Sequence, residues 1–582
     1  MYILGINAFH PDASAALLKD GELLVAVEEE RLNRVKHSAG FPYQAVGYCL
    51  KKAGIGLGDV DYVGITNNVT ANLHLKARFV LTQFSPLSWA KFMRQYFKAR
   101  LIKMLSVEET LAQASSVDLK HLKAKFYRIE HHPAHAASSF FVSGFNESAI
   151  LTLDGAGDFL TGIMAKGENS RMRILKRFSW PHSLGILYSG VTQYLGFPGA
   201  GDEGKVMGLA PYGAPAYVDK FKKIIKIEKG DFRLALDYFV HHRPEVVDRW
   251  GEPKSGSGDY SYEVSEKFHE LFGPPRKPEE QICQRHKDIA SSLQAALEEA
   301  VFSLLKRLYK LCPTDNLCLG GGTFLNCVLN GKIPQYTGFK NVFVQPGAGD
   351  AGTSIGCCFY IYHQILNQPR SFTMGNTYVG TEYSNEEIGQ LLKGYQLKYE
   401  CGDIERKTAQ AIACGRIIGW FQGRMEFGPR ALGNRSILAD PRNEEMKDIL
   451  NKKVKHREGF RPFAPSVLAE HCAEFFDNNK ASPFMLVTYN VLPDKIKLVP
   501  AITHVDGTGR VQTVDTQPNL RYRRLIEEFY KLTGIPMILN TSFNARGEPI
   551  VSSPEDAIKT FLSTQMDVLV LGDYLIDKSK QG

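Results

Sequence analysis

The amino-acid sequence predicts an α/β protein with two domains. Residues 317–326 (LCLGGGTFLN) and 342–356 (VFVQPGAGDAGTSIG) each have the pattern of an apolar strand, a glycine turn and the start of a helix. Between residues 367 and 385 the apolar periodicity is interrupted, and motifs of a different kind follow. We therefore expect one domain over residues 1–370 and a second over residues 385–582.

The elements of the first domain are expected in a simple order. A hairpin opens the chain over residues 3–30, and strands resume at residues 148–153. A long helix is expected from about residue 278 to residue 311, before the two glycine-turn segments, and a last helix ends at about residue 365. Residues 249–262 are rich in glycine and serine, so we expect a mobile loop that covers a cleft.

Two histidines and an aspartate predict a metal site. His131 and His135 stand four residues apart, so a helix presents both imidazoles on one face. Asp154 ends the strand expected at residues 148–153 and completes an open set of three nitrogen and oxygen ligands. The cysteines form no CxxC pair, which argues against a closed structural zinc site. The alternative is a helix cap at His131 and a core histidine at His135, and the neighbouring motifs favour the metal.

The two glycine turns, Asp154 and the opening hairpin together match a known pattern. It is the duplicated half-domain of the actin, sugar kinase and Hsp70 superfamily. This resemblance implies that Asp350, in the second glycine turn, is a fourth metal ligand.

A series of motifs over residues 1–365 resembles the N-terminal domain of a known enzyme family. This family comprises the O-carbamoyltransferases that modify nodulation factors, cephem and aminoglycoside antibiotics and related natural products, and its N-terminal domain is similar to the tRNA threonylcarbamoyl transferase. The motifs, in the family's order, are FHPDASAALL, EEERLNRVKH, HHPAHAASS, LDGAGD, GDEGKVMGLAPYG, LGGGTFLN and PGAGDAGTSIG. The resemblance implies iron(II), or another divalent transition metal, on His131, His135, Asp154 and Asp350. It also implies an adenylate held by Gly320, Gly321, Gly322 and Asn326.

Cationic side chains and phenylalanines are interleaved in the second domain. Residues 420–442 and 454–466 are broken by glycine and proline, so their cations are expected on irregular backbone, where guanidinium groups can converge on one anion. These cations are Arg424, Arg430, Arg435, Lys455, Arg457 and Arg461. Later motifs add two further cations, Arg510 and Arg546, and two neutral polar residues, Ser542 and Asn544. The phenylalanines between them indicate a lined pocket rather than a solvated surface.

These motifs resemble the family's C-terminal domain, which is similar to the synthase that makes threonylcarbamoyl-AMP from ATP. The resemblance implies that Arg430, Lys455, Arg510 and Ser542 contact carbamoyl phosphate and nucleotide, and we expect Asn544 and Arg546 to belong to the same binding site. It also implies two stages. Carbamoyl phosphate and ATP with Mg²⁺ form carbamoyl-adenylate in the C-terminal domain, and a hydroxyl of a natural product then attacks the carbamoyl carbon in the N-terminal domain.

The attacking alcohol needs a positioned base, because it is a poor nucleophile at neutral pH. His10, Asp12, Asp154 and Glu203 are the candidates in the N-terminal motifs. We favour His10 or Asp12, because their motif lies in the first hairpin, where this superfamily lines its cleft. Lys36 and Lys205 are better suited to bind anionic groups than to transfer protons.

Two other functions compete with carbamoyl transfer to a small molecule. A tRNA-modifying threonylcarbamoyl transferase shares both domain types, but the RALGNRS and REGFRPFAP motifs are those of the carbamoyltransferases. A non-enzymatic ATP-binding module of the actin and Hsp70 type needs no transition metal, so the histidine pair argues against it.

Composition agrees with an ordinary cytoplasmic enzyme. The chain has 582 residues, 44% hydrophobic and 23% charged, and a formal net charge of +8. No apolar run reaches the roughly 18 residues of a membrane helix, and the N-terminus lacks the features of a signal peptide. We expect a homodimer with a small hydroxyl acceptor and with neither a membrane nor a nucleic acid as partner.

A basic stretch accounts for most of the positive charge. Residues 70–107 contain no acidic residue and an apolar pattern at helical spacing. Their seven cations are Lys76, Arg78, Lys91, Arg94, Lys98, Arg100 and Lys103. We expect this segment to dock on its own domain or on a sister subunit, rather than on a membrane or a nucleic acid.

Overall fold

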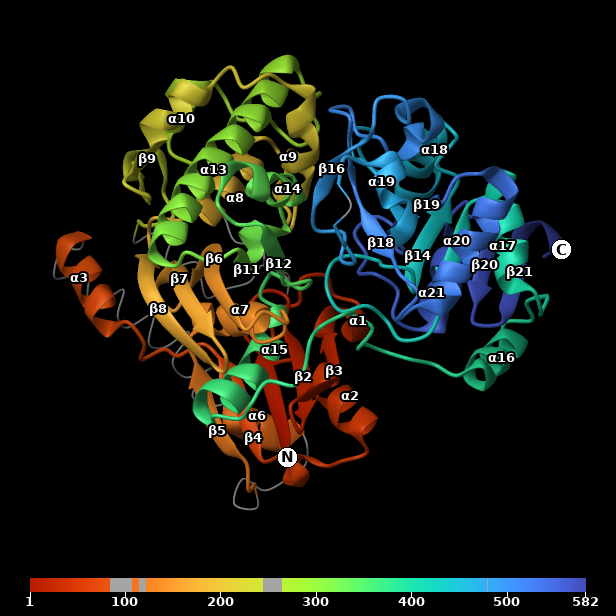
Figure 1. Cartoon of the computed structure of the whole chain (residues 1–582), viewed down its shortest axis with the longest axis horizontal. Helices are drawn as coiled ribbons and strands as arrows, with labels where there is room; N and C mark the ends of the chain where they lie inside the picture. Colours follow the sequence, from red (N-terminus) through yellow and green to blue (C-terminus); the bar gives the residue numbers. More distant parts are fainter. Residues whose placement is uncertain (84–106, 115–121, 244–263, 479, 582) are drawn as a thin grey trace. The chain divides into compact units, whose positions relative to one another are not determined.

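A computed structural model describes residues 1–83, 107–114, 122–243, 264–478 and 480–581. Within it the chain divides into two compact units, Met1–Met374 and Gly375–Gly582. Figure 1 colours the first unit from red to green and the second from green-cyan to blue. The loop expected at residues 249–262 lies outside the described residues, and so do Lys91, Arg94, Lys98, Arg100 and Lys103 of the basic stretch.

The N-terminal unit contains two five-stranded sheets of the same topology. The first has the order β3-β2-β1-β4-β5 and the second the order β8-β7-β6-β11-β12. In each sheet the first three strands along the chain form an antiparallel meander, and the last two join it in parallel. The first sheet comprises β1 (Tyr2–Asn7), β2 (Ser14–Lys19), β3 (Glu22–Glu28), β4 (Tyr62–Thr66) and β5 (Lys125–Ile129). The second comprises β6 (Glu147–Gly157), β7 (Leu160–Glu168), β8 (Arg171–Ser179), β11 (Asn316–Gly320) and β12 (Asn341–Val344).

This repetition confirms the predicted duplicated α/β fold. No short repeat in the sequence reveals it, because topology is preserved while side chains diverge. Helices α2 (Tyr43–Ala53), α8 (Leu184–Tyr194) and α13 (Gln284–Leu311) pack on the sheets, α2 on β2 and β3, and α8 and α13 on β6.

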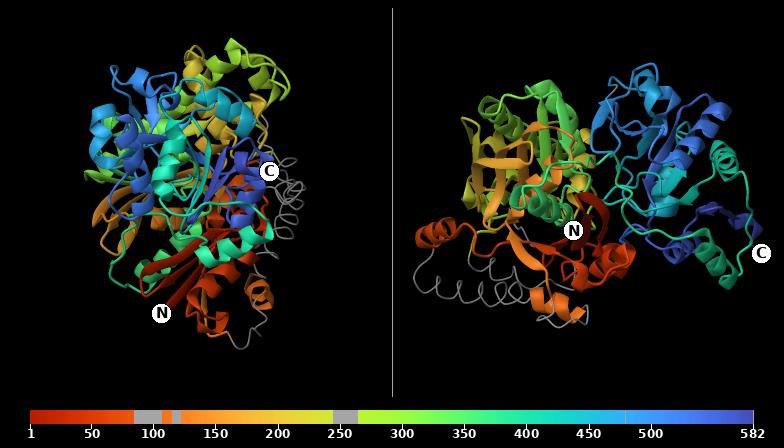
Figure 2. Two further views of the ribbon diagram at one scale, coloured as in Figure 1. Left: turned by 90° about the vertical axis from the view of Figure 1, so that its right-hand side faces the viewer. Right: turned by 60° about the horizontal axis from the view of Figure 1, so that its bottom comes forward.

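Two helices lie between the sheets (Figures 1 and 2). Helix α7 (His131–Phe140) packs on β6, β7 and β11, whereas α15 (Gly352–Phe359) packs on β1, β2 and β4, and the two helices contact each other. Their contact is backbone to backbone, since a Cβ on Gly356 would stand 1.9 Å from the carbonyl oxygen of Ala134. Each helix follows a parallel strand, β5 or β12, so both helix starts lie at the carboxyl ends of strands.

We expect Gly356→Ala to destabilise the N-terminal unit by about 1–3 kcal/mol, because the added methyl group must push the two central helices apart. Gly47→Ala in α2 is the matched control. A Cβ on Gly47 meets nothing within 4 Å, so this change should be neutral or stabilise by up to about 1 kcal/mol. Thermal denaturation of both variants measures the difference. Equal melting temperatures would contradict the close helix contact.

Three boundaries differ from the sequence-based expectations. The opening hairpin is a three-stranded meander, because Gly21 makes a second tight turn with a φ of +91°. The long helix begins at Gln284 rather than near residue 278, and Cys283 caps it together with His286. Strand β6 does not end at Asp154 but continues to Gly157, with a break of register between Leu153 and Gly157. Asp154 therefore lies in an irregularity of the strand, where its carboxylate can leave the pleat.

The C-terminal unit is a mixed seven-stranded sheet of order β18-β15-β19-β14-β13-β20-β21. Helices α17 (Ile404–Ala413) and α20 (Leu520–Thr533) pack against each other, with α17 on β13 and α20 on β15 and β19. The core of this unit includes Trp420, Phe421, Tyr522 and Phe543. The strands are β13 (Ile418–Phe421), β14 (Arg435–Ala439), β15 (Ala464–Leu468), β18 (Gln512–Val514), β19 (Met537–Ser542), β20 (Val568–Leu571) and β21 (Tyr574–Asp577).

In the part of the chain that the structure describes, no helix combines the length and the apolar content that crossing a bilayer requires.

Candidate functional site

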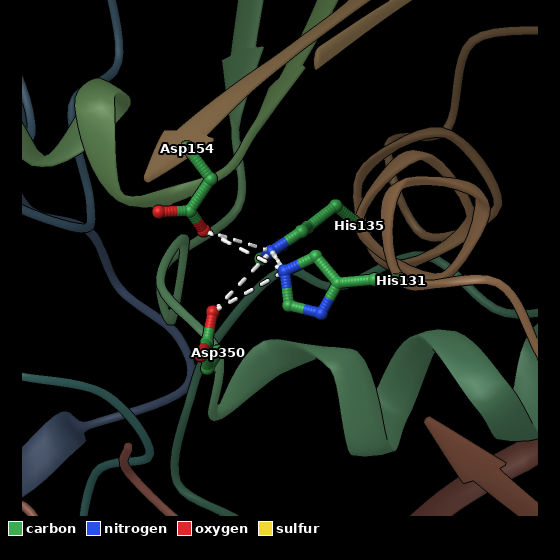
Figure 3. A group of neighbouring side chains, drawn as sticks. All are labelled: His131, His135, Asp154 and Asp350. Carbon is green, nitrogen blue, oxygen red and sulfur yellow. Dashed lines mark hydrogen bonds and ion pairs between the residues drawn. The ribbon is translucent and has the colours of Figure 1, made fainter. Parts of the chain in front are cut away.

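Four side chains of the N-terminal unit point toward one another (Figure 3). His131 and His135 come from the first two turns of α7, Asp154 from the irregular part of β6, and Asp350 from the loop between β12 and α15. One donor atom from each residue lies within 4.8 Å of the others. The two histidines are buried and the two aspartates are partly exposed, so the group opens on one side.

The spacing of these atoms fits one metal ion. The Nε2 atoms of His131 and His135 are 3.1 Å apart, and Oδ2 of Asp154 is 3.1 Å from Nε2 of His135. Oδ1 of Asp350 is 3.5 and 3.6 Å from the two Nε2 atoms. Nε2 of His131 is 3.9 Å from Oδ2 of Asp154. Two ligands at about 2.1 Å from one ion stand about 3.0–4.2 Å apart, depending on the angle between them, and all of these distances lie in that range. The donor set of two imidazoles and two carboxylates suits a divalent transition metal.

The electrostatics of the group also favour a cation. Burial raises the pKa of Asp154, but hydrogen bonds to the two histidines outweigh it and hold this pKa well below its usual range. Burial lowers the pKa of His135, yet the hydrogen bonds to Asp154 and Asp350 raise it to about 9. The carboxylates therefore stay charged, and a bound metal would take the place of protons between them and the imidazoles.

Close backbone contacts fix the ligands in place. A Cβ on Gly157 would stand 2.1 Å from Cγ of His131, so only glycine leaves room for this imidazole. Oδ2 of Asp158 accepts a hydrogen bond from the backbone nitrogen of His131 at 2.9 Å and so anchors the start of α7. On the other side, Ser183 Oγ donates to the carbonyl oxygen of Asp154 at 2.9 Å.

The first glycine turn lies directly against the metal ligands. A Cβ on Gly320 would be 2.7 Å from the carbonyl oxygen of His135, and one on Gly322 would be 3.2 Å from Oδ1 of Asp154. Gly321 has a φ of +97°, which favours glycine. A phosphate bound by this turn would be next to the metal. Asn326, expected on the adenylate, follows this turn, caps α14 (Cys327–Tyr336) and exchanges hydrogen bonds with Gln294.

The candidate bases lie at two places. His10 places Nδ1 3.5 Å from Oδ2 of Asp350, and its ring stacks on His131 with centroids 5.3 Å apart. Asp12 is paired with His37, a residue that sequence reasoning missed although it belongs to the RVKH motif, with Oδ1 and Nδ1 2.7 Å apart. The backbone of Gly201 covers His37, which brings the start of α9 (Glu203–Leu209) to this pair.

The remaining N-terminal candidates have other partners. Glu203 accepts a hydrogen bond from Ser189 Oγ at 2.5 Å, and Lys205 pairs with Asp202 at 2.8 Å. Lys36 is exposed beside His37. None of these contacts places Glu203 or Lys205 among the four clustered ligands.

A second polar cluster lies in the C-terminal unit around Lys455, which is 3% exposed. Its Nζ donates to the carbonyl oxygen of Ser542, to Ser542 Oγ at 3.3 Å, and to Asn544 Oδ1 at 2.8 Å. The acceptors of these hydrogen bonds are neutral oxygens, which do not cancel a positive charge, so the Lys455 side chain can also attract an anion.

The hydrogen bonds of Asn540 bring the other predicted anion contacts into the same region. Its Nδ2 donates to the carbonyl oxygen of Ala431 at 3.2 Å and to Gln512 Oε1 at 3.1 Å. Arg430, Arg510 and Ser542 are one or two residues away in sequence from these partners. Burial and the neighbouring Arg461 and Arg510 lower the pKa of Arg457 to about 9, so these cations also lie close together.

Two arginines of these motifs have structural surroundings that the sequence did not indicate. Arg435 lies in strand β14, fully buried over the ring of Phe421, and donates to four backbone carbonyls, including those of Gln422 and Thr381. It is therefore a core residue and not, as its motif suggested, a cation on irregular backbone. Arg546 is exposed and donates to the carbonyl oxygen of His456 at 3.2 Å.

Comparison with known proteins identifies the family. Residues 2–359 match the model of the carbamoyltransferase N-terminus, and residues 409–578 match that of the carbamoyltransferase C-terminus. The chain belongs to the carbamoyltransferase family. It is thus an enzyme that transfers carbamoyl groups, as its motifs predicted.

Two relatives of this carbamoyltransferase match nearly its whole length, and a third matches less than half of it. Nodulation protein NolNO of Sinorhizobium fredii is 40% identical over 581 residues, which cover 98% of this chain and 80% of that protein. An uncharacterized protein of Synechocystis, sll1178, is 41% identical over 100% of this chain and 97% of its own length. The 3'-hydroxymethylcephem-O-carbamoyltransferase of Streptomyces clavuligerus is 33% identical over 44% of this chain and 48% of its own.

Similarity to solved structures is much weaker. HypF of T. kodakarensis is 13% identical with a TM-score of 0.31, covering 62% of this carbamoyltransferase and 46% of HypF. The ROK hexokinase of Thermus thermophilus is 14% identical with a TM-score of 0.28, and the match covers 61% of this carbamoyltransferase and 98% of the hexokinase. At these scores no conclusion about function follows.

Proposed function

We propose that this carbamoyltransferase is an ATP-dependent O-carbamoyltransferase that acts in two stages on a small-molecule alcohol. The observation that supports it most is the group of His131, His135, Asp154 and Asp350 against a glycine turn that can hold a phosphate. The same proposal includes ATP with Mg²⁺, carbamoyl phosphate as donor, iron(II) as the metal, a homodimer and a cytoplasmic location.

In the first stage carbamoyl phosphate, ATP and water give carbamoyl-adenylate, pyrophosphate and phosphate. Both substrates are polyanions, so a site that brings them together must cancel their repulsion. Lys455, Arg430, Arg457 and Arg510 supply this positive charge in the C-terminal unit. Ser542 and Asn544 hold the ammonium group of Lys455 in place.

In the second stage the oxygen of the acceptor hydroxyl attacks the carbamoyl carbon, and AMP leaves with the electron pair of the broken bond. His131, His135, Asp154 and Asp350 would hold the metal, which when bound supplies a Lewis acid that polarises the carbamoyl group and neutralises the leaving phosphate. The glycine turn at residues 320–322 holds the adenylate phosphate beside these ligands. The relatives that modify cephems suggest a natural-product alcohol as acceptor, in antibiotic or other natural-product biosynthesis.

The test is a reaction of purified protein with carbamoyl phosphate, ATP, Mg²⁺ and a set of alcohols that includes 3'-hydroxymethylcephem and simple sugars. We expect pyrophosphate and AMP to form, and one alcohol to gain the mass of a carbamoyl group. Omission of carbamoyl phosphate should stop both products. Pyrophosphate release that does not depend on carbamoyl phosphate would refute the proposed donor.

A further inference from the structure

A second group of titratable side chains lies in the N-terminal unit, apart from the four candidate metal ligands. It consists of Asp12, Glu30 and His37, whose polar atoms lie within 4.8 Å of one another. Asp12 belongs to the loop between β1 and β2, the loop that also carries His10. His37 follows α1 (Glu29–Asn33), so the contact joins two segments 25 residues apart.

Buried charged residues contact the backbone of His37. Its backbone nitrogen donates to Oε2 of Glu30 at 2.7 Å, and the other oxygen of Glu30 pairs with Arg31 at 2.6 Å. Glu30 and Arg31 are both buried. The imidazole then places Nδ1 2.7 Å from Oδ1 of Asp12. Burial lowers the pKa of His37, but Asp12 and Glu30 raise it by more, so this pKa lies above its ordinary value.

The other carboxylate oxygen of Asp12 lies near the loop that carries the metal ligand Asp350. Oδ2 lies 3.8 Å from the position that a Cβ on Gly349 would take, and Gly349 precedes the ligand Asp350. In the part of the chain that the structure describes, no hydrogen bond to Oδ2 is recorded. His10, the other favoured base, instead has its Nδ1 directed at Asp350. Of the two, Asp12 has an oxygen available for a substrate proton.

We propose that Asp12 accepts the proton of the acceptor hydroxyl through Oδ2, and that His37 is the positioning residue that fixes Asp12 for this task. The inference rests on the proposed function. As the hydroxyl oxygen bonds to the carbamoyl carbon, its proton moves to Oδ2 of Asp12. The bond between this carbon and the adenylate oxygen breaks, and the electron pair leaves with AMP. A carboxylate held in one orientation needs no reorganisation during this step.

Backbone conformation determines which variants test this proposal. Asp12 and His37 have φ values of 55° and 54°, a region that glycine and asparagine tolerate best. His37→Gly removes the donor to Asp12 without backbone strain, and His37→Asn keeps an N–H group near the position of Nδ1. The matched control is His269→Asn, since His269 forms a similar pair with Glu266 at 3.2 Å in the same unit.

The assay separates the two stages by their products. Pyrophosphate release measures adenylate formation in the C-terminal unit. AMP release, with water and glycerol as the attacking molecules, measures the second stage. We expect His37→Gly to slow AMP release by about 10–100-fold, and Asp12→Asn to slow it by about 10²–10⁴-fold. His37→Asn should recover most of the loss. Pyrophosphate release and the His269→Asn control should match wild type.

The double variant Asp12→Asn/His37→Gly gives the decisive comparison. If His37 acts only through Asp12, the double variant is no slower than Asp12→Asn alone. Losses that multiply, or a His37→Gly variant with wild-type AMP release, would overturn the inference while leaving the proposed function in place. A wild-type protein that releases neither pyrophosphate nor AMP would refute the proposed function itself, and the inference with it.

Discussion

His135→Ala is expected to remove the metal and to slow carbamoyl transfer by at least about 100-fold, while adenylate formation continues. His135 is fully buried and its Nε2 lies within 3.6 Å of a donor atom of each other ligand. An alanine there leaves His131 and two carboxylates around an incomplete site, which binds a transition metal more weakly. Elemental analysis of protein purified with iron(II), together with product analysis, measures both effects.

The control for this prediction is His363→Ala. His363 is equally buried in the N-terminal unit, but its Nδ1 lies 2.9 Å from the carbonyl oxygen of Gln368, away from the four ligands. Any loss of stability from removing a buried imidazole should appear in both variants, whereas loss of metal should appear only in His135→Ala. Equal metal content in His135→Ala and wild type would refute the assignment of the ligands.

Lys455→Met is expected to reduce carbamoyl-adenylate formation by about 10²–10³-fold, because the anion site loses a buried positive charge that Ser542 and Asn544 cannot replace. Methionine keeps most of the side-chain volume, so the packing around Ser542 and Asn544 changes little. Pyrophosphate release that depends on carbamoyl phosphate is the measurement. Metal content should remain that of wild type, since the ligands belong to the other unit.

Lys578→Met is the matched control in the same unit. Lys578 also donates to backbone oxygens, those of Phe561 and Thr564 at the end of α21 (Pro554–Ser563), but it lies outside the cationic motifs described above. The Lys578→Met variant should be less stable than wild type, but it should show no specific loss of pyrophosphate release. If Lys578→Met and Lys455→Met were equally active, Lys455 would be a structural residue rather than an anion ligand.

Local patterns in the sequence were sufficient for several features of this carbamoyltransferase. The four-residue spacing of His131 and His135 gave their common helix face, because an α-helix repeats every 3.6 residues. The glycines that follow two apolar strands predicted the loops at Gly321 and Asp350, because a turn also depends on the residues that form it. The family motifs predicted the transfer of carbamoyl groups and the α/β fold.

The tertiary structure decided which side chains meet. Periodicity reports the local backbone and its buried face, but it contains no information on pairing between distant segments. Asp154 therefore appeared as a strand end, although β6 continues past it with a break of register. Arg435 and Lys455 looked alike in the sequence, yet one is a core residue and the other a buried cation among neutral oxygens. The pair of Asp12 and His37 depends on the contact between two loops, and no spacing within either motif determines it.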